Sequence, residues 1–208
     1  MTVPTRLTDR KRSAILAAAA EQFRTHGYEN ASVDSIAALA EVSKRTVYNH
    51  FPSKDLLFAE TIMHMFESSA GMLELGYRPD LGLREQLEEL MRQKMRSLGD
   101  RDFLDLARVA IGEAIHAPER TLPILGRLNE LEEGVTRWIR AAQEDGRLKP
   151  GDPAFAAHAL QGQVKTFAFW PQIAMGAAPL KLDEQERVID AAVSMFLAYF
   201  AADSQPRA

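Results

Sequence analysis

Residues 43–54 place hydrogen-bonding and cationic side chains around two apolar anchors, an arrangement suited to contact with nucleic acid. Ser43 can cap a short helix, because its hydroxyl can accept a hydrogen bond from an orphan backbone N–H of the first turn. Val47 and Phe51 lie four residues apart, so they share one helix face and can bury it. The other sides then carry Lys44, Arg45, Thr46, Tyr48, Asn49 and His50. A helix held from behind that offers donors in front can read base edges in the DNA major groove.

In isolation, this segment also fits an ordinary solvated helix face, so the residues before it decide between the two interpretations. Ser32 can cap a helix over residues 33–40, and Asp34 falls in its first turn, where the helix dipole favours a negative charge. Residues 40–42 then form a three-residue turn that leads into the helix capped by Ser43. Helix, short turn and helix is the helix-turn-helix plan of many DNA-binding proteins.

A third helix upstream would cover this pair. Residues 8–26 hold apolar and small side chains at helical spacing, and Gly27 follows as a candidate left-handed C-terminal cap. The three helices would form a DNA-binding domain over residues 1–53, and residues 54–208 would form a second domain. We place Lys54, at the junction, on a DNA phosphate together with Tyr48, and we add Ser32 to the DNA-contacting set.

Residues 8–58 resemble the TetR family of bacterial transcriptional regulators. The resemblance is carried by 15–19, Phe23, 27–28, 32–33, 36–37, 42–44, 46–48, 50–51 and 53–57. One position departs from the pattern, because the family usually has glycine in the turn where this chain has Glu41. If that position needs a positive φ, a non-glycine residue costs on the order of 1 kcal/mol.

The charge distribution fits a discrete DNA-contacting head. The whole chain has a formal net charge of −4. Residues 1–55 nevertheless carry eight basic and six acidic side chains, a net of +2, whereas the remainder has a net of −6. A basic head on an acidic body suits a specific DNA reader better than a purely charge-driven binder. Arg10, Lys11 and Arg12 are candidates for phosphate contacts from a flexible lead-in to the first helix.

Several classes of protein are excluded or disfavoured. The chain has no cysteine, so it has neither disulfides nor a thiolate site. No apolar run reaches membrane-spanning length, and the basic start does not resemble a signal peptide, so we expect a cytoplasmic protein without a membrane partner. No motif for a cofactor or a metal declares itself.

The sequence after residue 53 predicts helices throughout. Together with the three helices of the DNA-binding domain, this predicts an all-α protein of nine to ten helices. Alanine, leucine, methionine, glutamate, arginine and glutamine dominate, and strand-like alternation is absent. Proline, glycine and capping residues divide the body into helices expected over residues 54–75, 83–98, 101–117, from 118 onward with a kink or split at Pro123, 128–145, 153–175 and 183–202.

The last two helices are apolar over more than one stripe, which exceeds what a surface helix needs. Two such helices from each of two chains can form a four-helix bundle, and the resemblance to the TetR family implies this dimer interface. The alternative is that they only close the core of a single chain. The interface residues we expect are Phe155, Ala159, Gly162, Val188, Ala192, Met195, Phe196 and Tyr199.

Residues 105–114, 117–119 and 164–171 look like the AefR-type branch of TetR-like C-terminal domains. Members of the TetR family commonly hold a small-molecule pocket in this helical body, so the resemblance implies a small apolar or amphipathic effector. Such pockets are mostly apolar with a few polar groups. The candidate lining residues, each of which also fits ordinary core or surface duty, are Phe66, Met72, Phe103, Arg108, Glu113, His116, Trp138, Gln163, Phe167 and Trp170.

We therefore expect a homodimeric, ligand-responsive repressor that binds a palindromic operator in double-stranded DNA. A DNA-binding dimer without an effector is the first alternative. A helical metalloenzyme is a remote one, because Glu113 and His116 have the Glu-x-x-His spacing of carboxylate-bridged metal sites. Such sites need a second motif of this kind, and the sequence lacks one.

Overall fold

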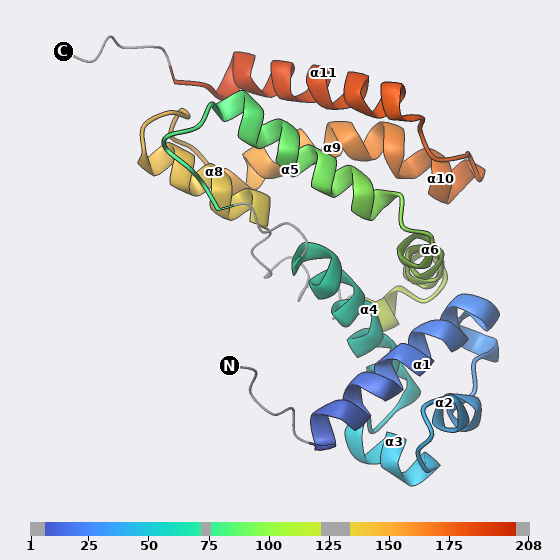
Figure 1. Cartoon of the computed structure of the whole chain (residues 1–208). Helices are drawn as coiled ribbons and strands as arrows, with labels where there is room; N and C mark the ends of the chain where they lie inside the picture. The colour runs from blue at the N-terminus through green and yellow to red at the C-terminus, as the bar shows by residue number, and fades with distance from the viewer. Residues whose placement is uncertain (1–6, 72–75, 122–133, 203–208) are drawn as a thin grey trace. The chain divides into compact units, whose positions relative to one another are not determined.

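The computed structural model describes residues 7–71, 76–121 and 134–202 (Figure 1). Ten α-helices occupy these residues, and the only strand-like pairing among them is an isolated bridge between Leu148 and Ala201. The prediction of an all-α protein is confirmed. The chain forms two compact units, the first from Met1–Ser68 and Asp105–Glu130 and the second from Ser69–Leu104 and Leu131–Ala208.

The first unit contains the predicted helix-turn-helix. It is built from α1 (Leu7–Asn30), α2 (Val33–Leu39), α3 (Lys44–His50), most of α4 (Lys54–Gly71) and most of α6 (Arg101–His116). A helical turn over residues 118–121 follows α6, so a helix does start at Pro118 as predicted. The core of this unit is made by buried side chains of all five helices, including Ile15, Phe23, Ile36, Val47, Phe51, Phe58 and Leu106.

Capping side chains fix where these helices begin. Ser32 Oγ accepts from the backbone N–H of Ser35 at 3.0 Å, and Ser53 Oγ accepts from that of Leu56 at 3.1 Å. Gly27 lies inside α1 as a kink with φ 72° and ψ 173°. The positive φ agrees with the predicted need for glycine, but ψ is extended, so Gly27 is not the left-handed helix cap that the sequence predicted.

Glu41 occupies the turn between α2 and α3 with φ 53°. Among the described residues it is the only non-glycine residue with a positive φ. The left-handed region places Cβ too close to the following carbonyl oxygen, which costs roughly 1–2 kcal/mol for an ordinary side chain. The turn nevertheless keeps its hydrogen bonds, since the Val42 N–H donates to the Ala37 carbonyl at 3.0 Å. The helix-turn-helix geometry therefore tolerates this departure from glycine.

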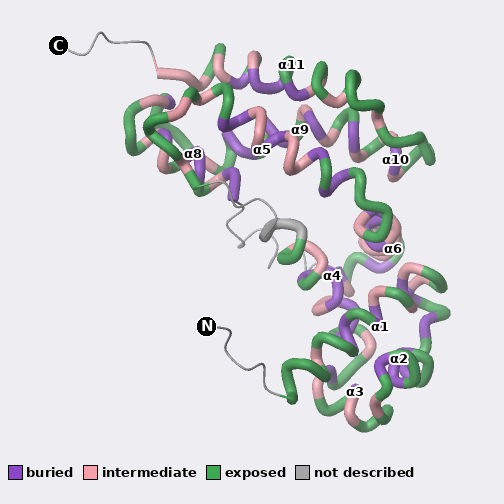
Figure 2. The backbone as a smooth tube through the Cα atoms, in the orientation of Figure 1, coloured by how far each residue is buried: buried purple, intermediate pink, exposed green. Residues whose placement is uncertain are grey.

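The second unit is a helical bundle in which α9 (Pro153–Ala168) packs against α5 (Leu83–Leu98), α8 (Gly134–Glu144) and α11 (Leu182–Phe200). The same four helices lie together in Figure 1. Along α11, buried and exposed residues alternate with the helical period (Figure 2). Ion pairs tie α5 to α11 at the surface, because Arg92 binds Glu186 at 2.9 Å and Arg84 binds Asp190 at 2.9 Å.

Two helix boundaries in this unit differ from the prediction. The helix expected over residues 153–175 is divided into α9 and α10 (Trp170–Met175), because the ring nitrogen of Pro171 has no N–H to continue the hydrogen-bond ladder. The last helix begins at Leu182 rather than Asp183, where the Glu184 carboxylate accepts from the Lys181 N–H at 2.8 Å. The expected kink at Pro123, the C-terminal end of the helix expected over 54–75 and the N-terminal part of the helix expected over 128–145 lie outside the described residues, whereas α8 ends at Glu144, close to the predicted end.

Candidate nucleic-acid interface

Helix α3 is held in the core by one side and leaves the other side exposed. Val47 and Phe51 are each 1% exposed, and they pack among the side chains of α1, α2 and α4. Arg45, Tyr48 and Asn49 are exposed. The division between anchors and donors therefore follows the i and i+4 spacing that the sequence predicted.

Hydroxyl groups organise both helix N-termini of the motif. Ser43 Oγ accepts from the Thr46 N–H at 3.1 Å and lies 2.8 Å from Thr46 Oγ1. Ser32 Oγ lies 2.8 Å from the hydroxyl of Ser35 in the same way. A hydroxyl combines one donor with two acceptor positions, so each of these pairs keeps capacity for a further hydrogen bond. The three predicted contact hydroxyls of Ser32, Ser43 and Thr46 are thus oriented by the caps themselves.

The cationic side chains of the motif differ in their engagement. Lys44 Nζ donates to Asp34 Oδ2 at 2.9 Å, and this hydrogen bond raises the pKa of Lys44 above its usual value. Arg45 and Asn49, by contrast, have no side-chain partner within the described ranges. The half-buried His50 lies against Phe51, with ring centroids 6.2 Å apart. Arg45 and Asn49 could therefore bind DNA without first breaking a side-chain contact to the described residues.

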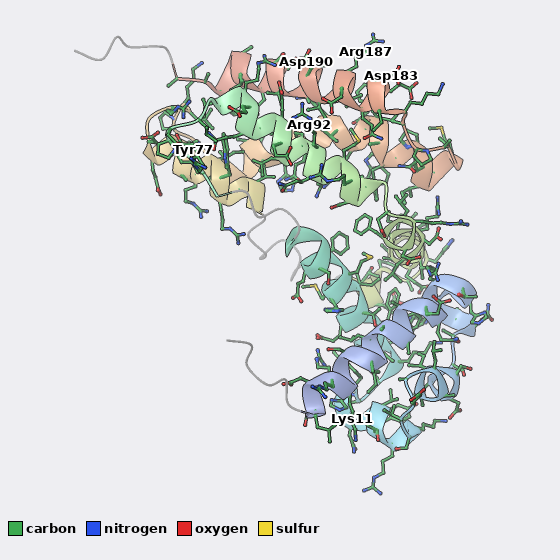
Figure 3. All side chains as sticks on the ribbon, viewed as in Figure 1. Lys11, Tyr77, Arg92, Asp183, Arg187 and Asp190 are labelled. Carbon is green, nitrogen blue, oxygen red and sulfur yellow. The ribbon has the colours of Figure 1, made fainter. Side chains whose placement is uncertain are left out.

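The basic residues Arg10, Lys11 and Arg12 belong to a helix and not to the flexible lead-in that the sequence suggested. Helix α1 already begins at Leu7, and Lys11 lies exposed near its start (Figure 3). Arg12 is engaged internally, because it binds Glu60 Oε2 at 2.6 Å and lies 4.6 Å from the centroid of the Phe51 ring. Arg12 therefore ties α1 to α4 and covers the end of α3, a role the sequence did not reveal.

A charged cluster surrounds Tyr28 at the end of α1. The Tyr28 hydroxyl donates to Asp55, and burial together with this carboxylate raises the pKa of the phenol above its usual value. Lys54 Nζ lies 4.5 Å from the centroid of the Tyr28 ring and donates to the Glu29 carbonyl at 3.0 Å. Arg120 Cζ lies 4.7 Å from the same centroid, and its guanidinium binds Glu29 Oε1 at 2.9 Å. Lys54 is thus held in place by Tyr28 and Glu29, and Arg120 contacts the same two residues.

The residues predicted to line an effector pocket are divided between the two units. Phe66, Arg108, Glu113 and His116 belong to the first unit, and Phe103, Trp138, Gln163, Phe167 and Trp170 belong to the second. Met72 lies outside the described residues. Trp138 is only 1% exposed and is part of the core, whereas Phe167 is 56% and Trp170 49% exposed. Their assignment to a ligand pocket stays a prediction.

A surface groove of about 460 Å³ runs between α9 and α11. Gln163 and Phe167 line it from α9, and Glu184, Arg187 and Met195 line it from α11. The buried Oε1 atom of Gln163 has no hydrogen-bond partner within the described residues. Arg187 and Asp183 lie at the N-terminal part of α11 (Figure 3). The groove therefore combines apolar side chains with the exposed charged side chains of Glu184 and Arg187.

Apolar side chains remain exposed along both sides of this groove. Phe155 on α9 and Met195 and Tyr199 on α11 are all more than half exposed, Gly162 is exposed, and Ala159 and Val188 are partly exposed. We call these six residues the α9–α11 face. Ala192 and Phe196, which the sequence also suggested for a dimer interface, are buried in the core of the chain itself. Packing within one chain therefore accounts for these two residues, whereas the side chains of the α9–α11 face remain partly or fully exposed.

Glu113 and His116 do not lie in a metal-binding cluster in the part of the chain that the structure describes. The Glu113 carboxylate binds Arg120 at 3.0 Å, and His116 is exposed. No group of three or more potential metal-ligating side chains is found among the described residues. Within the same residues, no helix is both long enough and apolar enough to cross a membrane.

Comparison with known proteins agrees with this geometry. The family model for bacterial regulatory proteins of the tetR family matches residues 15–61, and the one for the C-terminal domain of AefR-like transcriptional repressors matches residues 85–202. A TetR family transcriptional regulator from Pseudomonas syringae pv. tomato str. DC3000 is 51% identical, with a TM-score of 0.77 over 95% of this chain and 100% of that one. The structure of the flavonoid-responsive regulator FrrA is 28% identical, with a TM-score of 0.73 over 96% of this chain and 99% of that one.

A curated relative gives the same assignment. The transcriptional regulator RutR of Escherichia coli (strain K12) is 27% identical over 170 residues, which cover 81% of this chain and 79% of RutR. The N-terminal match spans the helix-turn-helix described above, and the C-terminal match spans more than half of the chain. The protein therefore belongs to the TetR family of helix-turn-helix transcriptional regulators and is not an enzyme.

Proposed function

We propose that this protein is a homodimeric repressor that binds a palindromic operator and is released from it by a small apolar or amphipathic effector. The observation that carries the DNA-binding part is the geometry of α3, which buries Val47 and Phe51 and exposes Arg45, Tyr48 and Asn49. A helix anchored in this way can enter the major groove with its donors in front. The DNA-contacting set in this proposal is Ser32, Ser43, Lys44, Arg45, Thr46, Tyr48, Asn49, His50 and Lys54.

The homodimer is supported by the α9–α11 face. Its exposed apolar side chains are more than a monomer surface needs, and a palindromic site requires two heads related by two-fold symmetry. The repressor role is supported by the description of the C-terminal domain family, whose members are named as transcriptional repressors.

The effector is supported by the name of one relative, FrrA. FrrA is named as flavonoid-responsive, which indicates that a body of this fold can respond to a planar, amphipathic small molecule. A DNA-binding dimer without an effector remains the alternative function. The groove between α9 and α11 favours it, because two of the predicted ligand contacts, Gln163 and Phe167, line a surface suited to a second chain.

The test of dimeric DNA binding is a salt titration. If each of two heads contacts about three to five phosphates, log K against log[salt] is expected to slope at roughly −5 to −9. Binding should saturate at one dimer per palindrome, measured by fluorescence anisotropy and analytical ultracentrifugation with a palindrome selected from a random DNA pool. A slope of log K against log[salt] near zero would contradict the proposal, and so would a single protomer that binds the palindrome with full affinity.

Arg45→Ala is expected to change the bases that the protein selects. Arg45 is exposed and has no side-chain partner among the described residues, and arginine is the usual bidentate partner of a guanine edge. Losing such a pair should cost about 1–3 kcal/mol at one position of each half-site. The measurement is in-vitro selection from a random pool with the variant and with the parent protein.

The matched control is Tyr48→Phe, which removes one hydroxyl from the same helix. We place Tyr48 on a phosphate, so this variant should bind all sequences more weakly and keep the selected consensus. An Arg45→Ala protein that selects the parental consensus at every position would show that Arg45 does not read bases.

A further inference from the structure

The Tyr28 cluster connects a phosphate-contacting lysine to a residue far along the chain. Lys54 begins α4 directly after the helix-turn-helix, and its side chain is half-buried against Tyr28 and Glu29. Arg120 follows α6, yet it contacts the same two residues. Both cations therefore contact the same aromatic ring and the same glutamate.

Arg120 is itself fixed from several sides. Its guanidinium binds Glu113 Oε2 at 3.0 Å on α6 and Glu29 Oε1 at 2.9 Å on α1, and its Nε lies 3.9 Å from Asp55 Oδ1 on α4. The planar guanidinium presents donors in a rigid fork and can also lie against an aromatic face, so it can satisfy all these neighbours together. Arg120 thus joins α1, α4 and α6 at one point.

The electrostatics make this arrangement interdependent. Asp55, which accepts from the Tyr28 hydroxyl, is also close to Arg120, and Glu29 offers its carboxylate to Arg120 and its carbonyl to Lys54. Without Arg120, the carboxylates of Glu29 and Asp55 would lack their shared cation, and Lys54, which already donates to the Glu29 carbonyl, could replace it. A lysine drawn onto a carboxylate cannot donate to a phosphate with the same proton.

We propose that Arg120 is a positioning residue for DNA binding, which keeps Lys54 available to a phosphate by occupying the carboxylates around Tyr28. This inference rests on the proposed function, in which Lys54 contacts the DNA backbone. Because Arg120 follows α6 and binds Glu113 on that helix, a displacement of α6 would reach Lys54 through Arg120. DNA affinity then depends on a residue outside the helix-turn-helix.

A double-mutant cycle tests the proposal with Arg120→Ala, Lys54→Ala and the double variant. The probe is mixed-sequence duplex DNA at low salt, because phosphate contacts act on any sequence. Arg120→Ala is expected to lower affinity about 5- to 20-fold in the parent protein and less than about twofold in the Lys54→Ala protein, since residues that act through one contact are not additive. The salt slope should become shallower by up to about 2 in both single variants, one phosphate being lost per head.

Controls separate positioning from loss of structure. Arg24→Ala removes another partly exposed arginine of the same unit, which pairs with Glu21 on its own helix, and should leave the salt slope unchanged. Arg120→Lys keeps the charge without the planar fork and should restore part of the affinity. Circular dichroism and thermal unfolding identify a variant that fails to fold, in which case the Arg120→Lys cycle gives the same comparison.

Each outcome has one meaning. If Arg120→Ala lowers affinity equally with and without Lys54, or not at all, Arg120 is not a positioning residue. If Lys54→Ala leaves affinity unchanged while the parent binds DNA, Lys54 makes no phosphate contact and the inference falls, although the regulator assignment stands. If the parent protein does not bind duplex DNA, the proposed function itself is overturned.

Discussion

Trp138→Ala is expected to lower the free energy of unfolding by about 3–5 kcal/mol. The indole is 1% exposed in the core of the second unit and meets the Tyr77 ring edge-on at 5.4 Å between centroids. Its Nε1 donates to Gln86 Oε1 at 3.2 Å, and Gln86 in turn binds the N–H and the carbonyl of Arg78. The substitution would therefore open a large cavity. It would also remove one hydrogen bond from the buried Gln86, whose other hydrogen bonds order the chain before α5.

The measurement is urea unfolding at fixed protein concentration, because a dimer's stability depends on that concentration. Trp170→Ala is the matched control, since Trp170 is 49% exposed and its removal should cost about 1 kcal/mol or less. Equal losses for the two tryptophans would contradict the assignment of Trp138 to the core. Because of this core role, Phe167→Ala is the better probe of effector binding, which it should weaken without unfolding the protein.

Met195→Glu is expected to convert the proposed dimer into monomers and to lower operator affinity by at least about 100-fold. Met195 lies on the α9–α11 face, where it is 57% exposed and lines the groove. In a two-fold dimer the substitution buries two carboxylates without partners, and an uncompensated buried charge typically costs 3–5 kcal/mol. Loss of the partner head then removes half of the DNA contacts.

Analytical ultracentrifugation measures the association, and anisotropy measures the affinity for the selected palindrome. Met195→Leu keeps an apolar side chain of similar volume at the same position and should preserve both the dimer and the affinity. Thermal unfolding of the separated monomer shows whether the second unit retains its own core. A Met195→Glu protein that remains dimeric would place the interface elsewhere on the chain.

Features specified by a few neighbouring residues were predictable from the sequence. The Ser32 and Ser43 caps, the burial of Val47 and Phe51 and the start of α9 at Pro153 were all predicted and are confirmed. Each depends on a hydroxyl or carboxylate two or three residues from the backbone N–H that donates to it, on proline geometry or on the helical period. These interactions are local, so the sequence shows both partners at once.

Features that depend on distant partners were not predictable. The pairing of Arg12 with Glu60 spans 48 positions, and that of Arg120 with Glu29 spans 91. Periodicity shows which side of a helix is buried but not which helix covers it. The division of the expected helix 153–175 at Pro171 was missed for a different reason, because a proline can either kink a helix or end it, and the neighbouring packing decides.

In the proposed complex, the ion pair between Lys44 and Asp34 is expected to change how DNA affinity depends on salt concentration. A phosphate bound by a free cation expels one condensed counterion, whereas Lys44 must first leave Asp34. The vacated carboxylate, close to the DNA, then attracts a cation from solution and offsets part of that release. In the proposed complex, ion stoichiometry from a salt titration would thus undercount the phosphates in contact with each head. The shortfall in released ions would then reflect the replacement of Asp34 by a phosphate as the partner of Lys44, and not a phosphate that the protein fails to contact.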